Sequence, residues 1–188
     1  DHLKITDIPK MENAEVADLI ARFEPLVKHF NRYLTIGGFP ELALSDDDLY
    51  AQRMLREDVV DKVIKRDVLT LFKVRSPLLM EKLFLYLCMN STEIFSATTA
   101  AKELDNISPN TIESYVDALV KSNLIYMAYP IAVGSKSVLK GRPKIYIADA
   151  AIRNAVLMVD DVLSDERELG LLIETTVYKH LVSFYQGT

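Results

Sequence analysis

The sequence predicts a mostly helical chain with one small β ribbon, and three observations support this fold class. Apolar residues recur at three- and four-residue spacing through most of the 188 residues, which is the periodicity of amphipathic helices. Two short runs rich in β-branched and aromatic residues, 124–129 and 144–148, flank a polar loop and are typical of paired strands. Hydrophobic residues make up 49% of the chain, a share that supports a packed core and excludes a disordered chain.

The N-terminal part is expected to form helices that are interrupted at two places. Asn13 can cap the first helix, and Pro25 interrupts it or begins the next helix. The Gly-Gly-Phe-Pro sequence at 37–40 ends the second helix, because glycine permits unusual backbone angles and proline has no amide hydrogen. Ser45, followed by three aspartates, begins a further helix that we expect to run to about Phe72.

The middle of the chain is expected to form three helices followed by the ribbon. Pro77 begins a largely apolar helix, and a short helix at 100–104 follows it. A tight turn at 105–108 leads to a helix at 109–123, which Ser108 can cap. Three helices followed by a two-stranded ribbon is the order of elements in a winged helix, with the second and third helices as its helix-turn-helix.

The C-terminal part is expected to contain two helices joined by an acidic loop. The first runs from Ala150 to about Met158, and the last from about Leu169 to Tyr185. The apolar stripe expected on the last helix consists of Leu172, Ile173, Val177, Leu181 and Phe184.

Composition and motifs exclude several classes of protein. The single cysteine, Cys88, excludes a disulfide scaffold and a multi-cysteine metal site, fits a reducing cytoplasm, and lies in an apolar helix as a core residue would. No apolar run approaches the roughly 18 residues that a membrane span needs, and no signal peptide is visible. The Gly-Ser-Lys-Ser sequence at 134–137 is not a phosphate-binding loop, since no helix follows it. We expect no metal or cofactor in this chain, which we interpret as a fragment of a longer protein.

Two local features make nucleic-acid binding a candidate function despite a net charge of −5. Residues 134–148 contain no acid, and the side chains that we expect to contact phosphate there are Lys136, Lys140, Arg142 and Lys144. The outward residues at the start of the helix 109–123 that could reach bases are Asn110, Thr111 and Ser114. Glu113 and Asp117 would repel phosphate on the same helix, so a protein-contacting role stays open beside DNA binding.

Five segments between residues 30 and 182 occur in an order and spacing that resemble a known family. They are Tyr-Leu-Thr-Ile-Gly-Gly-Phe-Pro-Glu at 33–41, Lys-Arg-Asp-Val at 65–68, the helix-turn-helix at 98–124, Lys-Ile-Tyr-Ile-Ala-Asp with Ile-Arg-Asn-Ala at 144–155, and Leu-Ile-Glu-Thr-Thr-Val at 172–177. Together they resemble prokaryotic AAA-type (P-loop) ATPases that carry a C-terminal domain of unknown function. The first and fourth segments are the more specific ones.

The resemblance implies an architecture of three parts and a missing catalytic core. Residues 1–75 would be a helical lid-like bundle, 76–148 a winged helix, and 149–188 the helical start of a truncated α/β, restriction-endonuclease-like domain with Glu174 on its first helix. Gly37, Gly38, Pro40 and Glu41 would form a corner that faces a neighbouring domain. The parent's ATPase core would bind ATP and Mg²⁺. This chain has no Walker motif, and no Glu-x-Lys or Asp-x-Lys follows Glu174, so we expect it to catalyse neither ATP hydrolysis nor DNA cleavage.

The leading hypothesis is therefore a non-catalytic C-terminal fragment whose winged helix contacts DNA or a partner and relays ATP-driven movement. Its expected partners are the missing ATPase core, duplex DNA, and a protein partner or a second copy. A protein-protein interaction module without nucleic-acid binding and a stand-alone winged-helix transcription regulator are the alternatives.

Overall fold

The computed structural model describes residues 5–72, 74–131, 141–159 and 161–186 of the chain. Within them the protein is mostly helical with one two-stranded antiparallel sheet, which confirms the predicted fold class of a mostly α chain with a small β ribbon. Among the described helices, none combines the length and the apolar character that crossing a bilayer requires.

The N-terminal part contains two α-helices that meet at Pro25. They are α1 (Asn13–Phe23) and α2 (Val27–Ile36), and a 3₁₀ helix at Ile5–Lys10 precedes them. Pro25 lies in a 3₁₀ turn between the two helices, which confirms the predicted interruption. The predicted cap is wrong by one residue, because Glu12 occupies the N-cap position of α1. The backbone N–H of Glu12 donates to the carboxylate of Glu15 (2.9 Å), so the acid three residues later fixes the start of the helix.

A long helical stretch follows the Gly-Gly-Phe-Pro turn. It consists of α4 (Asp48–Met54), π-helical segments at Leu55–Asp61 and Val63–Val68, and α5 (Leu69–Leu71), and a short α3 (Pro40–Ala43) precedes it. The predicted start at Ser45 is wrong, because Asp47 is the N-cap and accepts the backbone N–H of Tyr50 (2.9 Å). The Ser45 hydroxyl instead accepts the N–H of Asp47 (3.2 Å) and shapes the preceding turn. The predicted end near Phe72 is confirmed.

Three further helices form before the ribbon, in the predicted order. They are α6 (Pro77–Met89), α7 (Ala97–Glu103) and α8 (Pro109–Lys121). The helix α7 begins three residues earlier than predicted, because the Ser96 hydroxyl accepts the N–H of Thr99 (3.3 Å) and caps it. Asp105 and Asn106 adopt left-handed backbone angles (φ 64° and 55°) in the turn between α7 and α8. Ser108 lies at the N-cap of α8 as predicted, although its side chain makes no capping hydrogen bond.

The ribbon consists of β1 (Ile125–Ala128) and β2 (Lys144–Ile147). They pair antiparallel with Tyr126 opposite Tyr146. On its other edge β2 receives the segment after α6, because the Phe95 N–H donates to the carbonyl of Pro143 (2.8 Å) and the Ile145 N–H donates to that of Glu93 (3.1 Å). The ribbon is thereby fixed to the end of α6 as well as to α8.

Two helices complete the described fold, α9 (Ala150–Leu157) and α10 (Glu166–Gln186). Asp149 caps α9 by accepting the N–H of Ala151 (2.9 Å), and Met158 (φ 53°) ends it in a left-handed conformation. The helix α10 begins three residues earlier than predicted. Its start is fixed by Asp165, whose carboxylate accepts the N–H groups of Arg167 (2.8 Å) and Glu168 (3.1 Å).

The apolar stripe predicted for the last helix is wrong. Leu172 is buried, but the other four predicted members are exposed, namely Ile173, Val177, Leu181 and Phe184. The buried face of α10 instead carries Thr175 and Thr176, with Lys179 partly buried below them. Lys179 is held on this face by Asp149 at the start of α9 and by Tyr33 of α2, and the spacing of apolar residues cannot reveal such distant partners.

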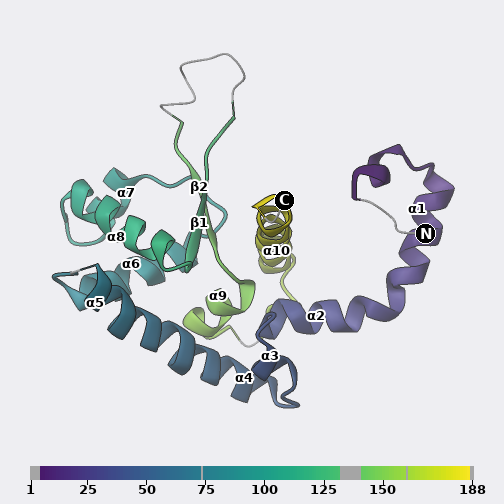
Figure 1. Ribbon diagram of the computed structural model, residues 1–188, viewed down its shortest axis with the longest axis horizontal. Helices are drawn as coiled ribbons and strands as arrows, with labels where there is room; N and C mark the ends of the chain where they lie inside the picture. The colour runs from purple at the N-terminus through teal and green to yellow at the C-terminus, as the bar shows by residue number, and fades with distance from the viewer. Residues whose placement is uncertain (1–4, 73, 132–140, 160, 187–188) are drawn as a thin grey trace.

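Figure 1 shows how these elements are arranged. The α4–α5 stretch runs along one side of the molecule, with α6, α7, α8 and the ribbon above one end and α2 and α1 beyond the other. The helices α9 and α10 lie between these two groups. One apolar cluster reaches from α2 through the long helical stretch, α6, α8 and the ribbon to α9. The division at residues 75 and 148 stays a prediction.

Cys88 belongs to this core, as its apolar surroundings predict. Its side chain is fully buried in α6. Burial raises the pKa of the Cys88 thiol, and the nearby positive charge of Arg153 opposes that shift only in part. The thiol is therefore held in its protonated form, which makes it a packing residue and not a nucleophile.

Two glycines at the end of α2 permit close contacts between distant segments. Gly37 has φ 77°, and a Cβ atom built on it would lie 2.6 Å from Oδ1 of Asp149. A Cβ atom on Gly38 would lie 2.9 Å from the ring of Tyr33. Both contacts are closer than real Cβ atoms allow, so this turn is a packing junction within the chain as well as a helix stop.

Replacing Gly37 with alanine should therefore destabilise the fold. The left-handed backbone and the contact with Asp149 together predict a loss of about 1–3 kcal/mol in the free energy of unfolding, measured by urea denaturation. The matched control is Gly170→Ala in α10, where a new Cβ would meet nothing within 4 Å. That control should gain about 0.5–1 kcal/mol because alanine favours a helix interior. A Gly37→Ala protein as stable as the wild type would contradict the close packing.

Candidate functional site

The first polar cluster joins the start of α9 to α10 and α2. Asp149 is almost fully buried and forms an ion pair with Lys179. The Lys179 ammonium also donates to the hydroxyl of Tyr33 (3.2 Å), which in turn lies at hydrogen-bond distance (3.2 Å) from Nε2 of His180. Burial alone would lower the pKa of Lys179, but the hydrogen bond and charge of Asp149 outweigh it and raise that pKa. Lys179 therefore stays charged inside the fold.

The predicted interdomain corner lies against this cluster. Gly37 is buried against Asp149, and Gly38 contacts the Tyr33 ring, so both glycines face residues of this chain. Pro40 and Glu41 are exposed at the start of α3, where a role toward a neighbouring domain stays a prediction.

The second cluster is formed by two buried polar residues on α9. Arg153 is 4% exposed, and its Nε donates to the carbonyl of Cys88 in α6 (3.0 Å). Its two terminal nitrogens bind the carboxylate of Glu168 on α10 (2.5 and 3.3 Å). Asn154 is fully buried and donates to the carbonyl of Leu34 in α2 (3.0 Å). Arg153 and Asn154 thus connect α9 to α6, α10 and α2, and this role is structural.

The third cluster connects the ribbon to α10. The Glu174 carboxylate accepts hydrogen bonds from the Lys144 ammonium (2.5 Å) and the Tyr146 hydroxyl (2.9 Å). The ring of Tyr146 stacks on Tyr178 with 3.9 Å between the centroids and 9° between the planes. Tyr178 also meets Tyr126 edge-on.

This environment changes three acid–base equilibria. Burial and the Glu174 carboxylate raise the pKa of Tyr146 well above its ordinary value, and burial raises that of Tyr178. Burial by itself would raise the pKa of Glu174, but hydrogen bonds from Lys144 and Tyr146 outweigh it and lower that pKa. Glu174 is thus an ionised partner of Lys144. In the described ranges no group of three or more His, Cys, Asp or Glu side chains could hold a metal ion.

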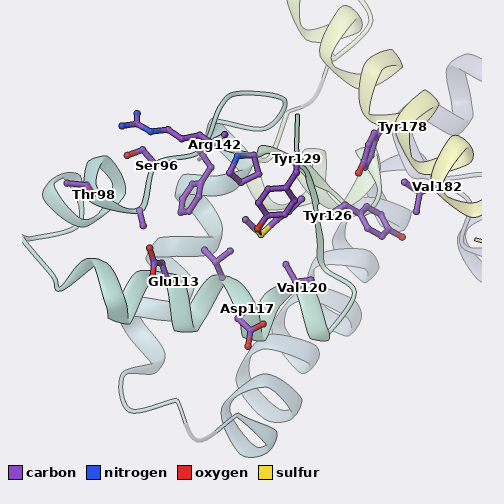
Figure 2. Close-up of a pocket in the computed structure, with 16 residues that line it drawn as sticks. Ser96, Thr98, Glu113, Asp117, Val120, Tyr126, Tyr129, Arg142, Tyr178 and Val182 are labelled. Carbon is purple, nitrogen blue, oxygen red and sulfur yellow. The ribbon is translucent and has the colours of Figure 1, made fainter. Parts of the chain in front are cut away.

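A groove of about 760 Å³ lies between α8 and the ribbon, and Figure 2 shows the side chains that form it. Glu113, Asp117 and Val120 lie along the α8 wall, while Tyr126, Tyr129 and Arg142 come from the strands and the ends of the loop that joins them. Tyr178 and Val182 of α10 approach from a third side. The remaining lining residues are Phe95, Ser96, Ala97, Thr98, Val116, Met127, Gly141 and Pro143.

The predicted nucleic-acid-binding residues are only partly brought together. Asn110 and Ser114 are exposed on α8, and Thr111 is half-buried beside them, but these three do not line the groove. Arg142 is exposed at the groove. Lys144 pairs with Glu174 at a partly exposed position, and its contact with phosphate stays a prediction. Lys136 and Lys140 lie outside the described residues.

Sequence reasoning missed the aromatic side chains of the groove. Tyr126 and Tyr129 were assigned to a strand and Tyr178 to the last helix, with no spacing that relates them. They border one groove because the fold brings α10 against the ribbon, where Tyr178 contacts Tyr126. No local sequence pattern predicts that contact.

Comparisons with other proteins give a family and relatives without a described activity. The sequence profile of a family described as "Domain of unknown function (DUF8612)" matches residues 27–163. The uncharacterized protein MJ1544 of Methanocaldococcus jannaschii is 24% identical over 185 residues, which is 95% of this chain and 40% of that protein. The uncharacterized protein MJ1637 of the same organism is 30% identical over 162 residues, which is 85% of this chain and 33% of that protein. The chain thus spans less than half the length of these relatives, and no solved structure matches it.

The Glu174 cluster predicts a change in tyrosine titration. In Glu174→Gln the negative charge beside the Tyr146 hydroxyl is lost, so the pKa of Tyr146 should fall, while burial keeps it above the ordinary value. Alkaline titration of tyrosinate absorbance, compared with a Tyr146→Phe variant, measures this shift. Glu166→Gln, in the exposed first turn of α10, is the control. Identical titration curves for Glu174→Gln and the wild type would contradict the hydrogen bond.

The lowered pKa of Glu174 also predicts how the free energy of unfolding of Glu174→Gln changes with pH. A carboxylate with a lowered pKa in the folded state contributes stability above its unfolded pKa, and this contribution is lost as the pH falls through the folded value. Glu174→Gln should therefore lose less stability than the wild type on acidification below pH ~4.5. Urea denaturation at a series of pH values tests this difference, and parallel pH profiles would argue against it.

Proposed function

This chain belongs to the family described as "Domain of unknown function (DUF8612)", and we propose that it serves as a non-catalytic arm of a longer, ATP-driven protein. In this proposal the arm carries a winged helix that contacts DNA or a partner, and it transmits movement from an ATPase core outside this chain. ATP and Mg²⁺ would be bound by that core. The residues of the chain would bind and position, and would not catalyse.

One observation carries the proposal, which is the pair of buried side chains Arg153 and Asn154. Through them α9 is hydrogen-bonded to the carbonyl of Cys88 in α6 and to that of Leu34 in α2. Buried hydrogen bonds of this kind are costly to break, because each would leave a carbonyl without a partner away from water. A displacement of α2 would therefore move α9, and α9 would in turn move α6 and the ribbon that is paired to the end of α6.

The arrangement of the middle segment supports a winged helix. The helices α6, α7 and α8 precede the β1–β2 ribbon, and the segment around Ile94 adds backbone pairing to the outer edge of β2. A short helix, a tight turn and a longer helix with an exposed N-terminal face are the parts through which helix-turn-helix proteins approach DNA.

Exposed apolar side chains and the comparison with longer relatives support a place within a larger protein. The chain covers 40% and 33% of the two relatives, which leaves room for a further domain in proteins of that length. Neighbouring apolar side chains are exposed on α1 and α2 (Ile20, Phe23, Val27) and on α10 (Val177, Phe184). Apolar groups gathered in this way usually meet another surface.

The relay can be tested in the full-length protein with Asn154→Ala. Loss of the hydrogen bond to α2 should leave ATP hydrolysis by the core within about twofold and abolish the effect of ATP on the affinity for duplex DNA. The control is Asn90→Ala, which removes a bond from Asn90 Nδ2 to the carbonyl of Tyr86 (2.8 Å) one turn earlier in the chain. An unchanged ATP effect in Asn154→Ala, or a full-length protein that hydrolyses no ATP, would overturn the relay.

DNA contact can be tested separately with the double variant Lys140→Glu, Arg142→Glu. If these cations meet phosphates, duplex affinity at low salt should fall at least ~10-fold, and the dependence of log affinity on log salt should flatten by about two. Arg22→Glu, Lys28→Glu makes the same change of charge on α1 and α2, away from the ribbon, and should bind as the wild type does. Equal affinities of the wild type and both double variants for duplex DNA would reject the proposed DNA contact of the loop between the strands.

A second candidate function is a protein-interaction module without nucleic-acid binding. The carboxylates of Glu113 and Asp117 on the outer side of α8 favour it, because they would repel a phosphate backbone at this face. The aromatic side chains of the groove also favour a protein contact, since aromatic residues are enriched at protein interfaces.

A further inference from the structure

The groove between α8 and the ribbon has two chemically different walls. The α8 wall presents two carboxylates, Glu113 and Asp117, one helical turn apart. The facing wall presents the aromatic rings of Tyr126 and Tyr129, with Tyr178 beside them. A ligand that lies between these walls must satisfy negative charge on one side and apolar, aromatic surface on the other.

Positive charge suits both walls. A carboxylate attracts a guanidinium or an ammonium group directly, and the negative face of an aromatic ring attracts the same groups at distances up to about 6 Å. The one cation that is both described and part of the lining is Arg142, and its guanidinium extends away from Glu113 and Asp117. Lys121 pairs with Asp117 (2.6 Å), but both side chains are more than half exposed, so an incoming cation can replace this weak contact.

The spacing of the two carboxylates defines the ligand more closely. Side chains four residues apart on a helix lie about 5–6 Å from each other. In an extended peptide, side chains two residues apart lie on one side at about 6.6 Å, and the residue between them points to the opposite side. An extended segment with cations at alternate positions would therefore reach both acids and turn its middle residue toward the tyrosines.

We propose that this groove binds an extended protein segment in which two arginine or lysine residues flank one apolar residue. The cations pair with Glu113 and Asp117, and the apolar residue packs on Tyr126 and Tyr129. The two carboxylates and the tyrosines of this binding site are not among the residues of the DNA contact considered above, although Arg142 of that contact borders the same groove. It does not depend on the relay through α9.

The test uses the full chain and two fluorescent pentapeptides, acetyl-Ser-Arg-Leu-Arg-Ser-amide and its counterpart with citrulline in place of both arginines. Citrulline keeps the shape of arginine and removes its charge. Fluorescence anisotropy at low salt should show binding of the arginine peptide at least ~10-fold tighter than that of the citrulline peptide. Glu113→Gln, Asp117→Asn should reduce the affinity for the arginine peptide to that for the citrulline peptide.

A matched variant separates this site from general attraction by an acidic protein. Asp18→Asn, Glu57→Gln removes the same two charges from exposed positions on α1 and the π-helical stretch and should bind the arginine peptide as the wild type does. Tyr129→Ser, at a side chain that is 59% exposed, removes the surface on which the apolar residue packs and should weaken binding several-fold without altering thermal unfolding.

Three results would overturn the proposal. The first is equal affinity for the arginine and citrulline peptides. The second is undiminished binding of the arginine peptide by Glu113→Gln, Asp117→Asn. The third is an equal loss of binding in the distant Asp18→Asn, Glu57→Gln control. If the groove were instead a phosphate contact, neutralising Glu113 and Asp117 would tighten duplex DNA binding while peptide binding stayed unchanged, which also rejects the peptide site.

Discussion

The structure depends on the polar contacts that the short helix α9 makes from the interior. Asp149 at its start holds Lys179 of α10, while Arg153 and Asn154 hold backbone carbonyls of α6 and α2. The side chains of Asp149, Arg153 and Asn154 are buried, so breaking one of these contacts would leave a polar group without water or a partner. The two segments that resemble the ATPase family most specifically, 33–41 and 144–155, meet at this place. Their distinctive residues therefore serve the junction between helices, with Gly37 giving Asp149 the space it needs.

Charge is distributed so that different surfaces suit different partners. Lys179 is neutralised in a largely buried pair with Asp149, whereas Lys144 pairs with Glu174 at a partly exposed position. On the outer side of α8, Glu113 and Asp117 stand opposite tyrosines. Two carboxylates repel a phosphate backbone and attract a cationic peptide, whereas the start of α8 carries the uncharged polar side chains of the proposed DNA contact.

Local chemistry explains which parts of the fold could be predicted and which could not. Pro77 and Pro109 mark helix starts because proline fits the first helical turn. The starts of α4 and α7 were misplaced because several serine, threonine and aspartate residues in a row can each cap a helix. Asp47 and Ser96 are selected by the geometry of the turns that lead into these helices.

The sequence by itself determined the helical class, the ribbon, the order of the elements and the core position of Cys88, because these follow from apolar periodicity and from residues that begin or end helices. Only the tertiary structure decided which face of α10 is buried, that Lys144 is bound to Glu174, and that Tyr126, Tyr129 and Tyr178 border one groove. These features join residues that are 30 to 146 positions apart in the sequence. Periodicity reports the pattern within one helix, whereas the partner that compensates a buried charge becomes known only when distant segments meet.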